Sequence, residues 1–317
     1  MDVSVVIINW NTRDILRNCL ISIFANTKNV EFEVIVIDNA SSDGSVDMLK
    51  SEFPQVVSIE NSVNRGYAVA VNQGIAVAKG RYVLALNSDI IICDNAIEKT
   101  IRYADKHLEA AVIGCQVWED SDTIQTTCFR FPNAINLFLL MFGLAKIFKY
   151  NRVLGRERML WWNRKSERQV DVISGSFMLV RQEAIEQVGG MDEDYFLYYE
   201  ETDWCYRFKQ AGWEMRFWPG AKIIHDHGGR NSSKQEAVKM YVQMQKSCFI
   251  FFKKQRNLVS CISARLIMSL SLALRLCFWS AALLIKYICS DTKYEKQKVE
   301  EVWAAFNYCV FGIEPKD

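Results

Sequence analysis

The stretch YVLALNSD, residues 82–89, passes from a mostly apolar segment directly into Asn87, Ser88 and Asp89. A buried strand has no reason of its own to end on three polar residues, because a polar group without a partner is costly to bury. Two earlier segments, VSVVII at 3–8 and EVIVID at 33–38, are continuous apolar runs typical of strands covered on both faces. We therefore predict that the three segments are strands of one buried sheet.

The segments that connect these strands have helical character. Apolar residues recur at helical spacing over 15–24, VDMLKSEF at 46–53 is amphipathic, and AVAVNQGIAVAKG at 68–80 is rich in small residues. Strands that alternate with helices form α/β folds in which the sheet is mainly parallel. We expect this architecture for the N-terminal part of the chain.

Polar residues stand at or just after the carboxyl end of each predicted strand or strand-like run. They are Asn9, Asp38, Asn64 and Asp89. In open α/β sheets this edge is where ligands bind, although turn residues are common there in any case. Taken together, the four positions indicate a ligand site, which none of them indicates alone.

Several functional classes are disfavoured by the sequence. The chain has 317 residues with 38 Lys and Arg against 37 Asp and Glu, and nucleic-acid binders are usually basic, so no nucleic-acid partner is expected. NWNTRD follows the first strand without the glycines of a dinucleotide site, and there is no Walker A sequence. The ten cysteines include no CxxC pair, which argues against a zinc knuckle and favours a reducing compartment such as the cytoplasm.

The segment Asn87-Ser88-Asp89 resembles the short acidic motif of nucleotide-sugar glycosyltransferases. A carboxylate at this place holds a divalent cation, Mg²⁺ or Mn²⁺, which neutralises a departing nucleoside diphosphate. The common form of the motif has two aspartates. Here Asn87 supplies a neutral oxygen, so that Asp89 is the single carboxylate and a further ligand is needed.

Two of the three histidines, His225 and His227, are separated by one residue in IIHDHGG. On an extended segment, residues two apart point to the same side, so both imidazoles could reach one metal ion. In isolation, the pattern favours a pair of hydrogen-bonded surface histidines. Because the Asp89 site needs a further ligand, we predict that His225 completes the metal site and that His227 is the second candidate.

YYEETDWCYR places Glu200, Glu201 and Asp203 in the first turn of a predicted helix. Carboxylates favour helix N-termini for purely structural reasons, through the helix dipole and the unpaired amides. The aromatic residues on both sides, however, create surroundings in which a carboxyl group has a raised proton affinity and can act as a general base. Both interpretations apply to these three residues.

The ordered set of motifs resembles family 2 glycosyltransferases of the GT-A fold, and bacterial rhamnosyltransferases in particular. The resemblance covers roughly residues 3–255 and rests on the segments VSVVIINWNTRD, VIVIDNASSDGS, NRGYAVAVNQGI, LALNSD, SGSFMLVRQEAIEQVGGMDEDYFLYYEETDWCYR and PGAKIIHDHGG. It implies a nucleotide-diphospho-sugar transferase with a mainly parallel central sheet.

The resemblance also implies roles for individual residues. The predicted nucleotide-sugar site comprises Asn9, Asp38, Asn64, Arg65, Gly66, Asn87, Ser88 and Asp89. In the family, the base is the aspartate of a Glu-Asp pair. The resemblance places this role on Glu201, whose side chain is one methylene longer than that of aspartate. Asp203 is the alternative base, and Glu200 is the third catalytic candidate.

The activity implied is inverting, metal-dependent transfer of a sugar in cell-surface polysaccharide synthesis. The donor is a nucleotide-diphospho-sugar, dTDP-rhamnose first and a UDP-sugar second, and the acceptor is a saccharide or a polyprenyl-diphosphate-linked saccharide. Two other classes stay open: a nucleotide-sugar-binding protein without catalysis, and a membrane-attached scaffold. Donor hydrolysis and nucleotide binding distinguish these three classes.

The predicted organisation is a GT-A catalytic domain over 1–230 and a helical region over 231–317. Within the first, residues 1–117 form the nucleotide-binding half and 118–230 the acceptor half. Residues 258–290 are apolar except for Arg265, Arg275 and Lys286, which fall within roughly 80° of one another on a helix. We expect this helix to lie in the membrane interface on the inner face of the cell membrane, with a buried core helix and a tilted transmembrane helix as the alternatives.

Overall fold

The computed structural model describes residues 1–119, 123–226, 236–286 and 292–315. The chain divides into two compact units. The first comprises residues 1–131, 157–196 and 200–232, and the second comprises residues 132–156, 197–199 and 233–317. Each unit is described by itself below.

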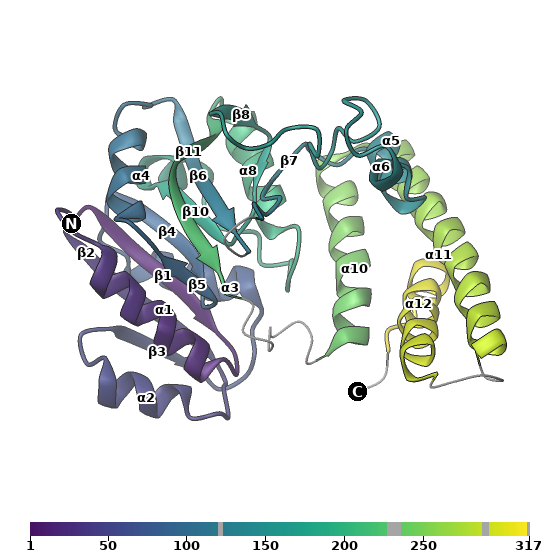
Figure 1. Ribbon diagram of the computed structural model, residues 1–317, viewed down its shortest axis with the longest axis horizontal. Helices are drawn as coiled ribbons and strands as arrows, with labels where there is room; N and C mark the ends of the chain where they lie inside the picture. Colours follow the sequence, from purple (N-terminus) through teal and green to yellow (C-terminus); the bar gives the residue numbers. More distant parts are fainter. Residues whose placement is uncertain (120–122, 227–235, 287–291, 316–317) are drawn as a thin grey trace. The chain divides into compact units, whose positions relative to one another are not determined.

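The first unit is built on a nine-stranded mixed sheet (Figure 1). Its parallel part has the order β3 (Val57–Asn61), β2 (Phe32–Asn39), β1 (Val3–Asn9) and β4 (Tyr82–Asn87). The sheet continues through β10 (Phe177–Arg181), β6 (Ala110–Trp118), β11 (Glu214–His225) and β5 (Ile90–Ile92), and β8 (Arg168–Val170) pairs with β11. A separate two-stranded sheet joins β7 (Cys128–Phe129) to β9 (Val172–Ile173).

The register of the parallel strands aligns their carboxyl ends. Asn9 at the end of β1 lies opposite Asp38 on β2, and Ile8 lies opposite Asn87 at the end of β4. Residues that are far apart in sequence, at 9, 38 and 87, thus meet at one edge of the sheet. The predicted clustering of the polar strand ends follows directly from this pairing.

Helices cover both faces of the sheet because successive strand residues point to opposite sides. On one face Val3, Val5 and Ile7 join a buried cluster with residues from α1 (Arg13–Asn26), α2 (Ser45–Glu52) and α4 (Ala96–Ala104). On the other face Val6 joins α3 (Tyr67–Val77), α7 (Gln182–Val188) and α8 (Glu200–Gln210). Burial on both faces explains why the strand sequences are apolar throughout.

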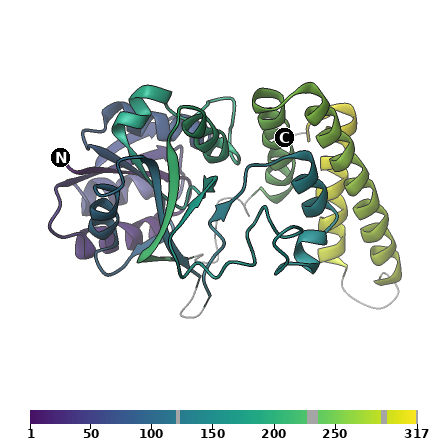
Figure 2. The ribbon, with the colours of Figure 1, turned by 90° about the horizontal axis from the view of Figure 1, so that it is seen from above.

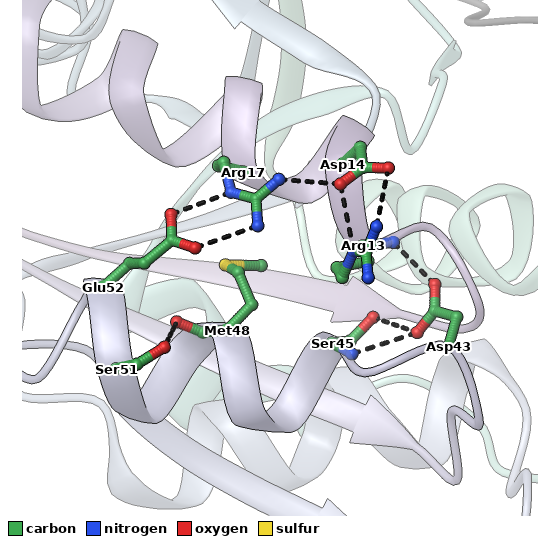
Figure 3. Close-up of polar contacts among 8 residues, drawn as sticks. All are labelled: Arg13, Asp14, Arg17, Asp43, Ser45, Met48, Ser51 and Glu52. Carbon is green, nitrogen blue, oxygen red and sulfur yellow. Dashed lines mark hydrogen bonds and ion pairs between the residues drawn. The ribbon is translucent and has the colours of Figure 1, made fainter.

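Charged residues join α1 to α2 near the end of β2 (Figure 3). The Arg17 guanidinium donates to Asp14 Oδ1 at 2.7 Å and, through two nitrogens, to the Glu52 carboxylate at 2.8 and 2.9 Å. Asp43 accepts hydrogen bonds from the backbone N–H of Arg13 at 2.7 Å and from Ser45. These bonds fix the loop that follows Asp38 and the start of α1, and they lie on the protein surface, where ion pairs add little stability.

The second unit is helical. It contains α5 (Ala134–Met141), α6 (Leu144–Ile147), α10 (Ala237–Gln255), α11 (Leu258–Lys286) and α12 (Lys293–Phe311). The last two run side by side in both views (Figures 1 and 2), and α5 packs on α11. α11 is long and apolar enough to cross a membrane, as judged by length and composition alone.

The arginines of α11 face the other helices of their unit. Arg265 donates to the Cys309 carbonyl at 2.8 Å, and Arg275 donates to the Met141 carbonyl at 2.8 Å and to the Tyr241 hydroxyl at 3.2 Å. Both residues thereby satisfy carbonyl oxygens at helix ends, where unpaired acceptors remain. Arg265 is nevertheless exposed and Arg275 half-buried, so the interfacial placement of this helix stays a prediction.

Two further features concern the organisation of the chain. Residues 132–156 group with the C-terminal helices, because α5 packs on α11. The segment 214–225 contains Pro219-Gly220 and is one strand whose register on β6 shifts between Phe217 and Lys222. The irregularity absorbs the proline, which cannot donate to a regular ladder.

Candidate functional site

A chain of buried polar side chains joins the ends of β1, β2 and β4. The Asn9 amide donates to Asp38 Oδ1 at 2.8 Å and to Ser41 Oγ at 3.1 Å. The Thr12 hydroxyl donates to Asn9 Oδ1 at 2.7 Å and lies 3.1 Å from Ser88 Oγ. Buried polar groups are retained when each has a partner, as here, and such a network holds Asp38 and Ser88 in fixed positions.

The loop over Asn64, Arg65 and Gly66 is held against the segment that precedes α8. Asn64 Oδ1 accepts from the Gly66 N–H at 3.0 Å, and the Tyr67 N–H donates to the Phe196 carbonyl at 2.7 Å. Gly66 has φ +82°, and a Cβ there would lie 2.4 Å from the Phe196 oxygen. Only glycine fits this close approach. Arg65 is exposed.

Asp89 and His225 come together from two adjacent strands. Asp89 directly precedes β5, His225 ends β11, and His225 pairs with Ile90. The Asp226 N–H donates to the Asp89 carbonyl at 2.8 Å, and His225 Nε2 lies 3.0 Å from Asp89 Oδ1. The structure thus places the two predicted ligands side by side. His227 lies outside the described residues.

Asn87 is the last residue of β4 and precedes Ser88, which contacts Thr12. Two hydrogen bonds hold the Asn87 backbone. The Asn87 N–H donates to the Ser176 carbonyl, and the Cys19 thiol donates to the Asn87 carbonyl at 3.9 Å. These contacts fix the strand end from which Asp89 follows.

Glu200 and Glu201 begin α8 as neighbouring carboxylates, of which Glu200 is buried and Glu201 half-buried. Within the described part of the chain, Oε2 of each is buried and has no hydrogen-bond partner. Burial raises the pKa of Glu200 well above its ordinary value, and the adjacent Glu201 charge raises it further. Burial also raises the pKa of Glu201, although the backbone N–H groups of Glu201 and Thr202 oppose the effect. A carboxylate with raised proton affinity is suited to general-base chemistry.

Tyr67 connects the two groups of carboxylates. Its hydroxyl donates to the Gly175 carbonyl at 3.2 Å. Burial raises the pKa of Tyr67, and the negative charges of Glu200, Glu201 and Asp89 raise it further. The charges at the start of α8 and the Asp89 charge after β4 therefore both raise the pKa of one hydroxyl. The sequence gives no signal for Tyr67, because nothing in NRGY distinguishes it from a core aromatic residue.

Asp203 is engaged in structural contacts. It is fully buried, its Oδ2 accepts from Arg207 Nε at 2.7 Å, and its Oδ1 accepts from the Tyr195 hydroxyl at 3.4 Å. Arg207 in turn donates to the carbonyls of Val188 and Gly190. Removing one partner of a buried ion pair is strongly destabilising, so these contacts favour a structural role for Asp203 over a catalytic one.

The residues at the carboxyl ends fit a divalent cation held together with a diphosphate. Asp89 Oδ1 is buried and makes no hydrogen bond within the described residues, although His225 Nε2 faces it at 3.0 Å. Two adjacent ligands of an octahedral ion, each about 2.1 Å from the metal, are about 3.0 Å apart. No set of three metal-binding side chains is present in residues 1–119, 123–226, 236–286 and 292–315. The pair would therefore need substrate oxygens to complete the ion's coordination.

The sequence matches the model of glycosyl transferase family 2 over residues 4–189. The chain belongs to this family. The model described as glycosyl transferase family group 2 matches residues 145–313, which include the helices of the second unit. The family assignment made from the sequence motifs is confirmed.

Two relatives with curated names are rhamnosyltransferases. The chain is 26% identical over 237 residues to an N-acetylglucosaminyl-diphospho-decaprenol L-rhamnosyltransferase from Mycobacterium tuberculosis, covering 71% of this chain and 75% of that protein. It is 25% identical over 266 residues to the rhamnosyltransferase WbbL of Escherichia coli, covering 81% of this chain and 94% of that protein. The likeness to rhamnosyltransferases that the motifs indicated is confirmed.

Solved structures share the fold. The mannosyltransferase PcManGT from Pyrobaculum calidifontis, in complex with GDP-Man and Mn²⁺, aligns with TM-score 0.54 and 15% identity over 98% of this chain and 88% of its own. TarS of S. aureus aligns with TM-score 0.52 and 13% identity over 98% of this chain and 49% of its own. Together with the family match, these alignments confirm the predicted GT-A fold.

Glu200→Gln tests the electrostatic cost of the carboxylate pair. Below the ordinary glutamate pKa of 4.5, the folded and unfolded states both hold the proton. As pH rises above it, the unfolded state loses its proton first, so the carboxyl group increasingly destabilises the folded state until the raised folded pKa is passed. The variant should therefore unfold at a higher temperature than the wild type at pH 8, and the two should converge at pH 4.

Thermal unfolding followed by circular dichroism measures the difference, with the exposed Glu186→Gln as the matched control. A Glu200→Gln protein no more stable than the wild type at pH 8 contradicts the burial assigned to this pair.

Proposed function

We propose that the protein transfers a sugar, with rhamnose from dTDP-rhamnose as the first choice, to a saccharide or lipid-linked saccharide in cell-surface glycan synthesis. Family membership supports glycosyl transfer, and the names of both bacterial relatives support rhamnose. The name of the Mycobacterium tuberculosis relative also supports a lipid-diphosphate acceptor.

The observation that carries the proposal is a set of hydrogen bonds around Tyr67. Its N–H donates to the Phe196 carbonyl, shortly before Glu200 and Glu201, and its hydroxyl donates to the Gly175 carbonyl. The next carbonyl, that of Ser176, accepts from the Asn87 N–H at the strand end that leads to Asp89. We therefore propose that the diphosphate-binding group and the candidate base belong to one site.

The nucleotide is proposed to bind at the carboxyl ends of β1, β2 and β4. Asp38 and Asn9, fixed by their mutual hydrogen bond, would face the nucleoside. The Asn64–Gly66 loop and Ser88 would line the nucleotide further along the same edge. These groups are already held in place by bonds within the protein, so little ordering accompanies binding, which favours affinity.

Asp89 and His225 are the proposed ligands of a divalent cation, Mg²⁺ or Mn²⁺. Such an ion, when bound, would neutralise negative charge on the leaving diphosphate. The carboxylate and the imidazole converge without a third protein ligand among the described residues.

Glu201 is the proposed general base of a single displacement. It accepts the proton of the acceptor hydroxyl while that oxygen forms a bond to the anomeric carbon. The bond from this carbon to the diphosphate oxygen breaks on the opposite side, and the bonding electrons leave with the nucleoside diphosphate. The configuration at the anomeric carbon is inverted. Burial and the neighbouring Glu201 charge raise the pKa of Glu200, which helps keep a proton within the carboxylate pair.

Glu201→Gln should lower kcat about 10²–10⁴-fold, the usual contribution of a general base, and leave the Kd for the nucleoside diphosphate unchanged. Activity is followed as release of nucleoside diphosphate from dTDP-rhamnose and, in parallel, from a UDP-sugar, with and without Mn²⁺. Glu186→Gln, exposed on α7, serves as the control.

A fully active Glu201→Gln enzyme refutes the base assignment. Nucleotide binding by the wild type without any turnover would favour a binding protein without catalysis. A faster reaction with the UDP-sugar than with dTDP-rhamnose would make the UDP-sugar the donor.

We further propose that the helical unit attaches the protein to the cytoplasmic face of a membrane through α11. Its exposed large apolar residues occupy an arc of about 200° on a helix with 100° per residue, and Arg265 and Arg275 lie outside that arc. Each of these apolar side chains is more than half exposed: Leu258, Val259, Ile262, Leu266, Leu270, Leu274, Phe278, Leu284 and Ile285. A wide uncharged face of this kind suits a bilayer interface and the approach to a lipid-linked acceptor.

Replacing Leu266, Leu270 and Leu274 together by Gln should weaken binding to anionic phospholipid vesicles at least tenfold. Burying one leucine is worth about 1.5–3 kcal/mol, and each 1.4 kcal/mol is a factor of ten. The measurement is co-sedimentation, and the control replaces three exposed apolar residues of the first unit, Val57, Val63 and Leu108.

Vesicle binding equal to the wild type contradicts the proposed attachment. So does a variant that loses only self-association, because the apolar face would then cover a second copy of the chain.

A further inference from the structure

Both ring nitrogens of His225 face identified groups. Nε2 lies 3.0 Å from Asp89 Oδ1, and Nδ1 lies 2.9 Å from Gln125 Oε1. The His225 side chain is 11% exposed, so these contacts are made away from bulk water. Gln125 was not among the sequence-predicted site residues and has no part in the function proposed above.

Backbone pairing holds the three residues of this arrangement in place. Gln125 donates its N–H to the Val117 carbonyl at 2.8 Å, beside the bridge between Trp118 and Ile124. β11 pairs with this same end of β6, with Ile224 opposite Trp118. On its other side β11 pairs with β5, which begins directly after Asp89. The contact between Gln125 and His225 therefore belongs to the sheet edge and does not depend on a flexible side chain alone.

The chemistry of the amide oxygen decides which nitrogen of His225 carries the proton. An amide oxygen only accepts hydrogen bonds, so Nδ1 carries the proton when it faces Gln125 Oε1, and Nε2 of the neutral ring then presents a lone pair. That lone pair points at a carboxylate oxygen, a second acceptor. Two acceptors at 3.0 Å repel each other unless a positive charge is shared between them. Either a second proton on the ring, which makes it an imidazolium that donates to Asp89, or a divalent cation that both atoms ligate meets this condition.

We propose that Gln125 is a positioning residue that holds His225 with its proton on Nδ1. It thereby makes Nε2, together with Asp89 Oδ1, a ligand pair for the divalent cation. This rests on the proposed function. If the amide were turned so that its NH₂ group faced Nδ1, the proton would move to Nε2, and His225 would donate to Asp89 and have no lone pair for a metal. Metal-binding histidines generally donate their other N–H to such a partner.

Gln125→Leu tests the proposal through metal affinity. Loss of the acceptor should weaken Mn²⁺ binding about 10–100-fold, the usual effect of removing the partner of a metal-binding histidine. Free Mn²⁺ is measured by electron paramagnetic resonance during titration of the full-length protein, with Mn²⁺ alone and with thymidine diphosphate added. Gln125→Glu keeps an acceptor oxygen at this position and should retain the wild-type affinity.

Gln116→Leu is the matched control. Gln116 lies on β6, where its amide donates to the Arg164 carbonyl at 2.8 Å and accepts from Trp118 Nε1 at 3.3 Å. This variant therefore loses glutamine hydrogen bonds that do not involve the His225 side chain. Its Mn²⁺ affinity should equal that of the wild type. Thermal unfolding of all variants shows whether each is folded.

Three results would overturn the role of Gln125. They are unchanged Mn²⁺ affinity in folded Gln125→Leu, equal losses in the two leucine variants, and a wild type that binds no Mn²⁺ under either condition. Sugar transfer is measured separately. Transfer that needs no metal would refute this inference and leave the proposed function intact, whereas the expected Mn²⁺ pattern without transfer would refute the function alone.

Discussion

The parallel pairing of β1 with β2 and β4 is the constraint on which the site depends. The ladder brings Asn9 opposite Asp38 and Ile8 opposite Asn87, so three loops distant in sequence begin at one edge. A one-residue slip in either pairing would turn the following side chains to the other face of the sheet. The register is strongly specified because both faces of these strands are buried under helices.

The second half of the site is attached to this edge by different means. His225 is positioned by the antiparallel pairing of β11 with β5, while the start of α8 follows a segment that the Tyr67–Phe196 backbone bond ties to α3. A glycine at position 66 permits the close approach that this bond requires. Rigid elements thus hold the carboxylates, and Glu200 and Glu201 have raised pKa values because the fold buries them. The same burial that raises the proton affinity of these carboxyl groups lowers the stability of the folded protein.

Local sequence patterns predicted the parts of the structure that local physics decides. The β-branched runs formed strands, the small-residue segment formed α3, and Glu200 and Glu201 began a helix as expected. Long-range contacts were not predictable in this way. Nothing near Arg265 shows that its partner is the Cys309 carbonyl, and nothing near Gln125 shows that it faces His225 across the sheet edge. An aspartate at this position can act as a general base, and its residue type does not show whether it does so. Only the contacts of Asp203 with Arg207 and Tyr195 favour a structural role.

We propose that the strand-end residues and the start of α8 form a single donor site. A crystal structure with Mn²⁺ and thymidine diphosphate, with anomalous scattering used to locate the metal, distinguishes one shared site from separate ones. We expect one anomalous peak in contact with Asp89 and His225, the diphosphate bound to the same ion, and the nucleoside beside Asp38. A metal bound elsewhere, or a nucleotide seated away from the ends of β1, β2 and β4, would contradict it.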